Sequence, residues 1–385
     1  MDFKHHLYKL HQIGIALSSE RNLERLLEKI LKEAKSFTAA QGASLYIKEE
    51  NELHFSISQN DLLEKNCPKK EKFVFSHETL PISSRSIAGY VALTGKVVNI
   101  KNAYEISQEA PYHFNPYFDQ SHNYRTVSML VVPMKDIQEE IIGVLALINA
   151  QNERKEIIPF DAQYEPLILS LASQAGVAYV NAQLTKKLKE AYLDTIFRLA
   201  IAAECKEPDI KNHLENVSSY SVILAEEIGL PSQQIENIRY ASPMHDIGKI
   251  GISDTILFKA GKLTEEEYEE IKKHTIYGAK ILAHSKAEIL QISEQIALTH
   301  HENYDGSGYP QGLKREEIFL PGRIVMLADV FDALASKRYY KESWEFSKIV
   351  EYIQERAGKQ FDPKVVNAFL RRQKDFLAIS REEKV

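Results

Sequence analysis

Residues 164–202, in the middle of the chain, read YEPLILSLASQAGVAYVNAQLTKKLKEAYLDTIFRLAIA. This stretch has no proline after Pro166 and no glycine after Gly176, so no residue in its long second part breaks a helix. We therefore predict one long helix that joins two domains. The chain length of 385 residues also favours two domains, because it exceeds what one hydrophobic core usually organises.

The second part of this helix allows two interpretations. Leu184, Leu188 and Ala191 follow one another at spacings of four and three residues, as the core positions of a short parallel coiled coil do. The stretch is too brief to meet the usual criterion of several heptads, so a single amphipathic packing helix explains it equally well. The first interpretation predicts a homodimer formed through the N-terminal domain and the linking helix.

Residues before the long helix predict an α+β domain, an antiparallel sheet flanked by helices. Apolar residues recur at helical spacing from about residue 3 to 35, with an interruption at SSERN, which predicts two opening helices. Short segments rich in β-branched and aromatic residues then predict strands: ASLYIKEE, ELHFSIS, KFVFS, KVVNI, SMLVVPMKD and IIGVLALINA. The last two resemble a hairpin with DIQEE as its turn.

Residues after the long helix predict an all-α domain. Helical periodicity runs through HLENVSSYSVILAEEIGL, TEEEYEEIKKHTIYGAKILAH, ISEQIALTHHE and RIVMLADVFDALAS. The main irregular stretch is NYDGSGYPQGLKREEIFLPG, and long loops in compact helical domains often carry function. The predicted organisation is an N-terminal domain over residues 1–180, a linker helix over 181–200 and a helical domain over 201–385.

Composition narrows the function classes. A net charge of −6 argues against a general DNA-binding surface, although a local pocket for a small phosphate ligand remains compatible with it. The two cysteines, Cys67 and Cys205, are far apart and indicate neither a disulfide framework nor a thiolate zinc site. No segment approaches the roughly 20 apolar residues that cross a bilayer, and the charged N-terminus does not resemble a signal peptide. We expect a cytoplasmic protein without a membrane span.

A His/Asp constellation in the helical domain predicts a metal centre. The pair His245 and Asp246 lies in ASPMHDIGKIG, and adjacent side chains of this kind can hold one ion or bridge two. Asp329 lies in an apolar helix, where a buried carboxylate needs a cationic partner. Further candidates follow the helical pattern, so that the predicted ligand set is Asp209, His213, His245, Asp246, His274, His300, His301 and Asp329.

So many ligands suit two or three divalent ions rather than one. Oxygen and imidazole ligands without a thiolate favour iron, manganese or zinc. A closed structural metal site is the alternative, but such sites seldom use so many ligands. The position of Asp209, one helical turn before His213, decides between two ions and three.

At this point the motifs resemble a known family. Residues from about 200 to 375 are similar to the HD-GYP branch of the HD hydrolase superfamily, which cleaves cyclic di-GMP, a bacterial second messenger. The resemblance rests on HDIGKIG at residues 245–251, on His274, on HHE at 300–302, on DGSGYP at 305–310 and on DVFDAL at 329–334. It implies iron or manganese as the metal and a dimetal or trimetal site beside a GYP loop.

The resemblance also implies roles for individual residues in the hydrolysis of this signalling nucleotide. His245, Asp246 and Lys249 are expected to be catalytic, in a metal-assisted hydrolysis of cyclic di-GMP to pGpG. A three-metal site would allow GMP to follow as the final product. The expected substrate-binding residues are Lys249, Asp305, Gly308, Tyr309, Pro310, Asp332, Arg338 and Lys341. Without the resemblance to this family, the residues alone indicate that Lys249 is a solvated charge at a helix end and that Arg338 and Lys341 form a basic surface pair. A diguanylate cyclase is the partner implied for the GYP loop.

The sequence departs from the family pattern at two positions, and its N-terminal domain shows a second, looser resemblance. Asn216 stands where many relatives carry Arg, and Asp209 stands where the three-metal subset carries glutamate. Residues 1–180 are similar to GAF sensor domains, and Asn149 with Phe160 and Asp161 partly matches the cyclic-nucleotide-binding GAF signature. We expect an unidentified small ligand or dimerisation there. One alternative within enzymes is a hydrolase of another cyclic dinucleotide, such as 3′,3′ cyclic GMP-AMP. The alternative of a different class is a catalytically silent receptor of cyclic di-GMP.

Overall fold

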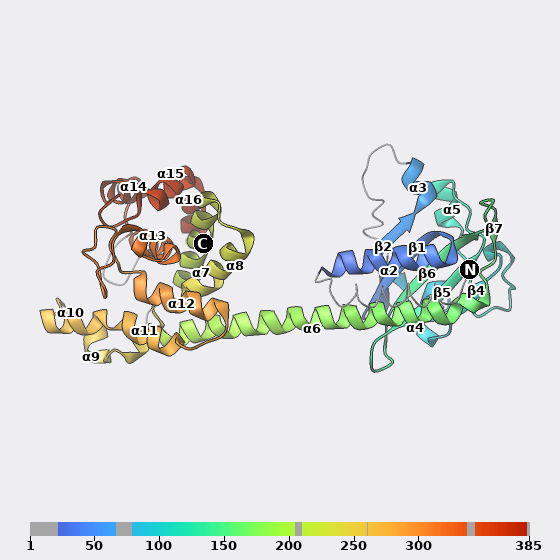
Figure 1. Cartoon of the computed structure of the whole chain (residues 1–385), viewed down its shortest axis with the longest axis horizontal. Coiled ribbons are helices and arrows are strands. Elements are labelled where there is room, and N and C mark those ends of the chain that lie inside the picture. Colours follow the sequence, from blue (N-terminus) through green and yellow to red (C-terminus); the bar gives the residue numbers. More distant parts are fainter. Residues whose placement is uncertain (1–21, 67–78, 205–209, 260, 337–342, 383–385) are drawn as a thin grey trace. The chain divides into compact units, whose positions relative to one another are not determined.

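The computed structural model describes residues 22–66, 79–204, 210–259, 261–336 and 343–382 (Figure 1). By its internal contacts the chain divides into two compact units, with the division between Leu188 and Lys189. The first contains the sheet, and the second is built from helices (Figure 1). None of the described helices is both long and apolar enough to span a membrane.

A seven-stranded antiparallel sheet forms the first unit. Its order is β3-β2-β1-β6-β5-β4, and β7 pairs with β6. The strands are β1 (Ala40–Glu49), β2 (Glu52–Asn60), β3 (Thr79–Pro81), β4 (Val98–Ile100), β5 (Met129–Lys135), β6 (Ile141–Gln151) and β7 (Ile157–Ile158). Five of the predicted strands are thus confirmed, whereas KFVFS lies outside the described residues, as does the first of the predicted opening helices.

Helices cover both faces of this sheet. They are α2 (Leu23–Thr38), α3 (Asp61–Asn66), α4 (Ile87–Thr94) and α5 (Tyr117–His122), with the short 3-10 helices η1 (Ala103–Glu105) and η2 (Ala162–Tyr164). Along β6, Leu145 and Leu147 pack with α2 and the first part of the long helix, whereas Val144 and Ala146 pack with α4. This alternation follows from the two-residue period of a strand and confirms the predicted α+β domain.

The predicted β5–β6 hairpin is confirmed, and its turn is closed by its own side chain. Strands β5 and β6 pair antiparallel. The Asp136 carboxylate accepts the backbone N–H groups of Gln138 and Glu140 at 2.8 and 3.0 Å. An aspartate in this position commonly stabilises a turn through such bonds. The sequence DIQEE therefore acts as the predicted turn.

Asn149, part of the partial GAF signature, is a structural residue in this unit. It is fully buried and adopts a left-handed backbone with φ of 57°. Its Oδ1 accepts the N–H of Val127 at 2.7 Å, and its Nδ2 donates to the carbonyl of Arg125 at 2.8 Å. The oxygen and the nitrogen of the side-chain amide both form hydrogen bonds with backbone groups. Asn149 therefore fixes the segment before β5 against β6.

The long helix is present as predicted. Helix α6 (Glu165–Ala203) has 39 residues. Its first part packs on the sheet through buried Ile168, Leu171, Ala172 and Ala175. Leu184 and Leu188 are 59% and 72% exposed, so these two residues are not core residues of the described chain.

The second unit is all-α, as predicted. Its helices are α7 (Ile210–Ile228), α8 (Ser232–Ala241), α9 (Asp254–Leu257), α10 (Glu265–Lys272), α11 (His274–Leu282), α12 (Glu288–Thr299), α13 (Leu320–Ala335), α14 (Phe346–Glu355), α15 (Pro363–Arg371) and α16 (Gln373–Glu382), with 3-10 helices η3 (Ser242–Met244), η4 (Ile247–Gly251) and η5 (Arg315–Glu317). Tyr220, Phe331, Phe369 and Phe376 are fully buried and stack edge to face or in parallel at its centre. This aromatic core fixes α7 against α13, the helices that carry the predicted ligands His213 and Asp329.

Candidate metal centre

The predicted ligands that the structure describes come together from five places in the helical unit. His213 comes from α7, His245 and Asp246 from the turn between η3 and η4, His274 from the start of α11, His300 and His301 from the end of α12, and Asp329 from α13. Their ligand atoms form two sets, each with all atoms within 4.8 Å of one another: Asp246 with His274, His300 and His301, and His213 with His245 and Asp329.

The first set is centred on the carboxylate of Asp246. Its Oδ1 lies 3.1 Å from Nε2 of His274 and 3.4 Å from Nε2 of His300. The two imidazole Nε2 atoms are 3.5 Å apart. Nitrogen and oxygen atoms that converge in this way suit a divalent transition metal.

The second set lies beside the first. Nε2 of His213 is 3.6 Å from Oδ1 of Asp329, and Nε2 of His245 is 3.9 Å from the same oxygen. His245 also links the two sets, because its Nε2 lies 3.3 Å from Oδ2 of Asp246. The adjacent pair predicted from the sequence therefore contributes one side chain to each set.

Each of four imidazoles is oriented through its second ring nitrogen. The Nδ1 atoms of His245, His274 and His300 lie 3.0, 2.7 and 3.0 Å from backbone carbonyls of residues 242, 271 and 296. The Nδ1 atom of His213 lies 2.7 Å from a carboxylate oxygen of Asp332. Such contacts fix the tautomer and direct Nε2 at the ion in metal proteins. A purely structural histidine cluster has no need of this common orientation.

Asp332 lies behind His213. Its side chain is 2% exposed, and its two oxygens accept from His213 Nδ1 at 2.7 Å and from Asn216 Nδ2 at 2.9 Å. With both oxygens engaged and almost no exposed surface, this position does not support the predicted substrate contact. Asp332 is a positioning residue for His213. Asn216 is connected to His213 through this carboxylate.

Buried polar atoms in the centre fit a bound cation. His245 Nε2 and Asp246 Oδ1 are buried, and within the described part of the chain neither makes a hydrogen bond of acceptable geometry. Burial would raise the pKa of Asp246, but Lys249 and His245 outweigh it and hold that pKa well below its usual value. Burial and the neighbouring His300 hold the pKa of His301 well below its usual value. The centre thus offers an ionised carboxylate and a neutral imidazole, the forms that bind metals.

The helix that carries His274 differs from the prediction. The sequence predicts one helix through residues 264–284, whose register places His274 close to the buried face with Ile271, with Ile276 or Tyr277, and with Ile281. The structure ends α10 at Lys272 and begins α11 at His274, and Ile276 and Ile281 are 38% and 52% exposed. The break turns the second helix, so that His274 is buried with Thr275, Gly278, Ala279 and Leu282 instead.

Gly248 in the HDIGK motif allows this packing. A Cβ atom at this position would lie 1.9 Å from the carbonyl oxygen of His274. Only glycine therefore lets η4 approach the start of α11 closely enough. The motif glycine is required by backbone contact rather than by contact with a ligand.

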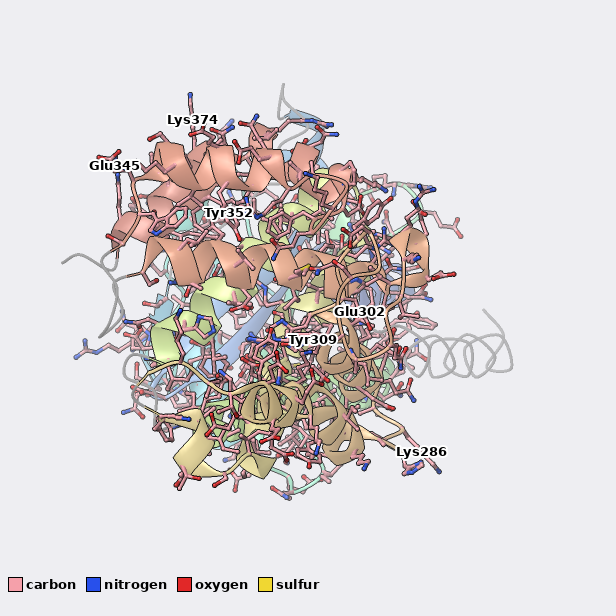
Figure 2. All side chains as sticks on the ribbon, turned by 90° about the vertical axis from the view of Figure 1, so that its left-hand side faces the viewer. Lys286, Glu302, Tyr309, Glu345, Tyr352 and Lys374 are labelled. Atoms are coloured by element: carbon pink, nitrogen blue, oxygen red, sulfur yellow. The ribbon has the colours of Figure 1, made fainter. Side chains whose placement is uncertain are left out.

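The GYP loop is anchored by Glu302. This residue is fully buried, and its carboxylate accepts the backbone N–H groups of residues 311, 312 and 313 at 2.6, 3.1 and 3.1 Å. Figure 2 labels Glu302 and Tyr309, both in the segment between α12 and α13. The Tyr309 ring stacks on the His301 imidazole with centroids 4.8 Å apart. The loop therefore borders the first ligand set.

The other predicted loop residues have structural contacts of their own. Asp305 accepts from the backbone and hydroxyl of Ser307 at 2.9 and 2.6 Å. The peptide bond between Tyr309 and Pro310 is cis. A Cβ atom at Gly308 would lie 2.2 Å from the backbone nitrogen of Asn303, so this glycine is needed for the close turn.

Lys249 reaches the centre together with a carboxylate that the sequence analysis missed. The Lys249 ammonium lies 2.9 Å from Oδ2 of Asp246 and 2.8 Å from Oε2 of Glu204. Glu204 follows α6 directly and is 3% exposed. The argument used for Asp329, a carboxylate in an apolar run, applies equally to Glu204 in LAIAAE and could have found it. Asp209, Arg338 and Lys341 lie outside the described residues.

Two family models match the chain, one in each of its two compact units. Residues 22–179 match the family model for the GAF domain, and residues 199–365 match that for the HD domain. A protein of Thermotoga maritima named cyclic di-GMP phosphodiesterase is 44% identical over 50% of this chain and 54% of its own length. The response regulator RpfG of Xanthomonas campestris, named a cyclic di-GMP phosphodiesterase, is 44% identical over 48% of this chain and 49% of its own length.

A third relative has a different named substrate. A protein of Vibrio cholerae named 3′3′-cGAMP-specific phosphodiesterase 2 is 40% identical over 53% of this chain and 39% of its own length. The chain spans about half the length of these relatives, or less. With the family matches, the chain contains a GAF domain and, after it, an HD domain of the HD-GYP type.

Proposed function

We propose that the HD domain hydrolyses cyclic di-GMP to pGpG, and pGpG on to GMP, with divalent ions held by the two ligand sets. The observation that carries this proposal is the convergence of Asp246, His274, His300 and His301 beside His213, His245 and Asp329. The names of the relatives from Thermotoga and Xanthomonas support cyclic di-GMP as the substrate. An HD domain of this type supports a divalent-metal requirement.

The two adjacent sets support two ions, and we propose iron or manganese. Neither set contains a thiolate, and carboxylate oxygen with imidazole nitrogen suits these metals. A third ion would add Asp209, which lies outside the described residues. His245 and Asp246, which contact each other at 3.3 Å, would keep the two ions adjacent.

The residues of the chain then have distinct tasks. Bound divalent ions supply Lewis-acid stabilisation of the phosphate and a water activated at neutral pH. Lys249 places a positive charge beside Asp246, where charge on the scissile phosphate develops. Tyr309, stacked on His301, forms a wall for the substrate at the first ligand set. Arg338 and Lys341 are proposed to bind the remaining phosphate through their cationic groups.

A second candidate substrate is 3′,3′ cyclic GMP-AMP. It is favoured by the name of the Vibrio relative, which is 40% identical. The two substrates differ in one purine base, so the metal centre alone does not choose between them. A silent receptor is not favoured, because the described ligands of both sets are intact and oriented.

The test is hydrolysis by the purified chain. Protein loaded with Mn²⁺ or Fe²⁺ without oxygen is incubated with cyclic di-GMP or 3′,3′ cyclic GMP-AMP, and products are separated by chromatography. We expect pGpG and GMP from cyclic di-GMP, with a higher kcat/KM than for the second substrate. The variants His245→Ala and Asp246→Ala should be inactive. Absence of turnover with both metals and both substrates would refute the enzyme.

Regulation and assembly are further parts of the proposal. We propose that the GAF domain binds a small ligand, in a cavity of about 210 Å³ lined in part by Tyr46, Phe55 and Phe118. A homodimer through the GAF domain and α6 would cover the exposed Leu184 and Leu188. A cytoplasmic location and a diguanylate cyclase partner at the GYP loop belong to the same proposal. Sedimentation of Leu184→Glu should show a monomer if the dimer uses this helix face.

A further inference from the structure

Glu204 is a buried carboxylate with no place in the ligand sets. Its side chain is 1% exposed. Its Oε1 is buried and has no hydrogen-bond partner among the residues that the structure describes, whereas its Oε2 lies 2.8 Å from the Lys249 ammonium. Burying a carboxylate is unfavourable unless a cation accompanies it. The buried position of Glu204 therefore depends on the positive charge of Lys249.

Lys249 lies between two carboxylates that differ in their other contacts. Asp246, at 2.9 Å, also contacts His274 and His300 and belongs to the first ligand set. Glu204, at 2.8 Å, belongs to neither set. A divalent ion bound at Asp246 would neutralise that carboxylate and repel the nearby ammonium. Glu204, which belongs to neither set, would not be neutralised by such an ion.

We propose that Glu204 is the positioning residue that holds the Lys249 ammonium at the metal-loaded centre. Glu204 acts through Lys249 and does not touch the substrate. The inference deepens the proposed function, because it rests on the assignment of Lys249 to the scissile phosphate. A lysine side chain has several rotatable bonds, so a buried, charged partner is an effective way to keep its head group at one place.

Kinetics of the full-length, Mn²⁺-loaded chain test the proposal. Glu204→Gln keeps the shape of the side chain and removes its charge. We expect kcat for cyclic di-GMP to fall about 10–100-fold, as is typical when an outer-shell partner is lost, with KM changed less than about threefold. Lys249→Met should lower kcat similarly. The double variant should be no worse than Lys249→Met alone, because the two residues act as one unit.

A second readout does not depend on catalysis. The loaded protein is treated with a limiting amount of an amine-reactive ester, and acylation of Lys249 is followed by mass spectrometry. Glu204→Gln should raise the rate at Lys249 severalfold, since the ammonium is no longer held. Glu236→Gln is the matched control, because Glu236 pairs with Lys189 at the same kind of distance, 2.9 Å, on the surface. It should change neither Lys249 acylation nor turnover.

The outcomes separate this inference from the proposed function. Wild-type turnover by Glu204→Gln, or a double variant that loses the product of the two single losses, would overturn the positioning role. Loss of metal by Glu204→Gln, measured by elemental analysis, would instead make Glu204 a ligand or a folding residue and overturn it as well. If the wild-type chain hydrolyses no cyclic dinucleotide, the proposed function fails. The positioning role of Glu204 is then tested by the acylation experiment alone, and an unchanged acylation rate of Lys249 in Glu204→Gln would overturn it.

Discussion

Replacing Asp332 with asparagine should weaken metal binding without touching a ligand. The Asp332 carboxylate accepts from His213 at 2.7 Å and from Asn216 at 2.9 Å, and its side chain is 2% exposed. An asparagine has one acceptor oxygen, so its amide nitrogen must face one of these two donors. The lost charge-assisted hydrogen bond contributes about 1.5–3 kcal/mol, which corresponds to a loss of roughly 10–100-fold in metal affinity.

The assay is a competition titration of Mn²⁺ against a chelator of known affinity, with unfolding by denaturant measured on the same samples. Asp362→Asn is the matched control, because Asp362 is also a buried carboxylate, paired with Arg323 at 2.6 Å and remote in sequence from every ligand. The control should lose stability and keep its Mn²⁺ affinity. Wild-type affinity in Asp332→Asn, or an equal loss of affinity in the control, would refute the reasoning.

Three further predictions follow from the centre and its surroundings. Gly248→Ala should lower the free energy of unfolding by about 1–3 kcal/mol, measured by denaturant titration, because its Cβ would lie 1.9 Å from the carbonyl oxygen of His274; an unchanged midpoint contradicts this. Although burial opposes it, the neighbouring carboxylates raise the pKa of His245 to about 10. Metal binding at pH 8 should therefore release about one proton from His245, and the affinity for the metal should weaken as the pH falls below 10. Calorimetry in buffers of different ionisation enthalpy measures this proton release. No release is expected if His245 is not a ligand. Glu302→Gln should speed proteolysis of the GYP loop, because a carboxylate that accepts from residues 311–313 is lost; equal cleavage rates would contradict the anchor.

Much of the fold could be predicted because its signals are local. Helix α6 follows from a stretch free of helix breakers, and β5 with β6 follows from two β-rich segments around a polar turn. The break between α10 and α11 is different, since the residues around Lys273 include neither glycine nor proline. That break accompanies the close approach of Gly248 to the start of α11, a contact between segments distant in sequence.

In the candidate metal centre, too, some features depend on contacts between residues that are distant in sequence. The sequence could indicate that Asp329 and Asp332 lie one turn apart on one helix, but not which of them faces an ion. The answer depends on the ring of His213, whose Nε2 lies 3.6 Å from Asp329 and whose Nδ1 lies 2.7 Å from Asp332. Only the tertiary packing of α7 against α13 sets that orientation. Glu204, in contrast, carried a readable signal in its apolar surroundings.

We propose that the two adjacent ligand sets of the HD domain hold divalent ions. The most direct test of this proposal is elemental analysis of metal per chain, on wild-type protein and on Asp246→Ala, both purified without chelator or oxygen. Two or more iron or manganese ions per wild-type chain, with a marked loss in Asp246→Ala, is the predicted result. One ion or fewer in the wild-type chain, or equal metal content in the variant, would contradict the account.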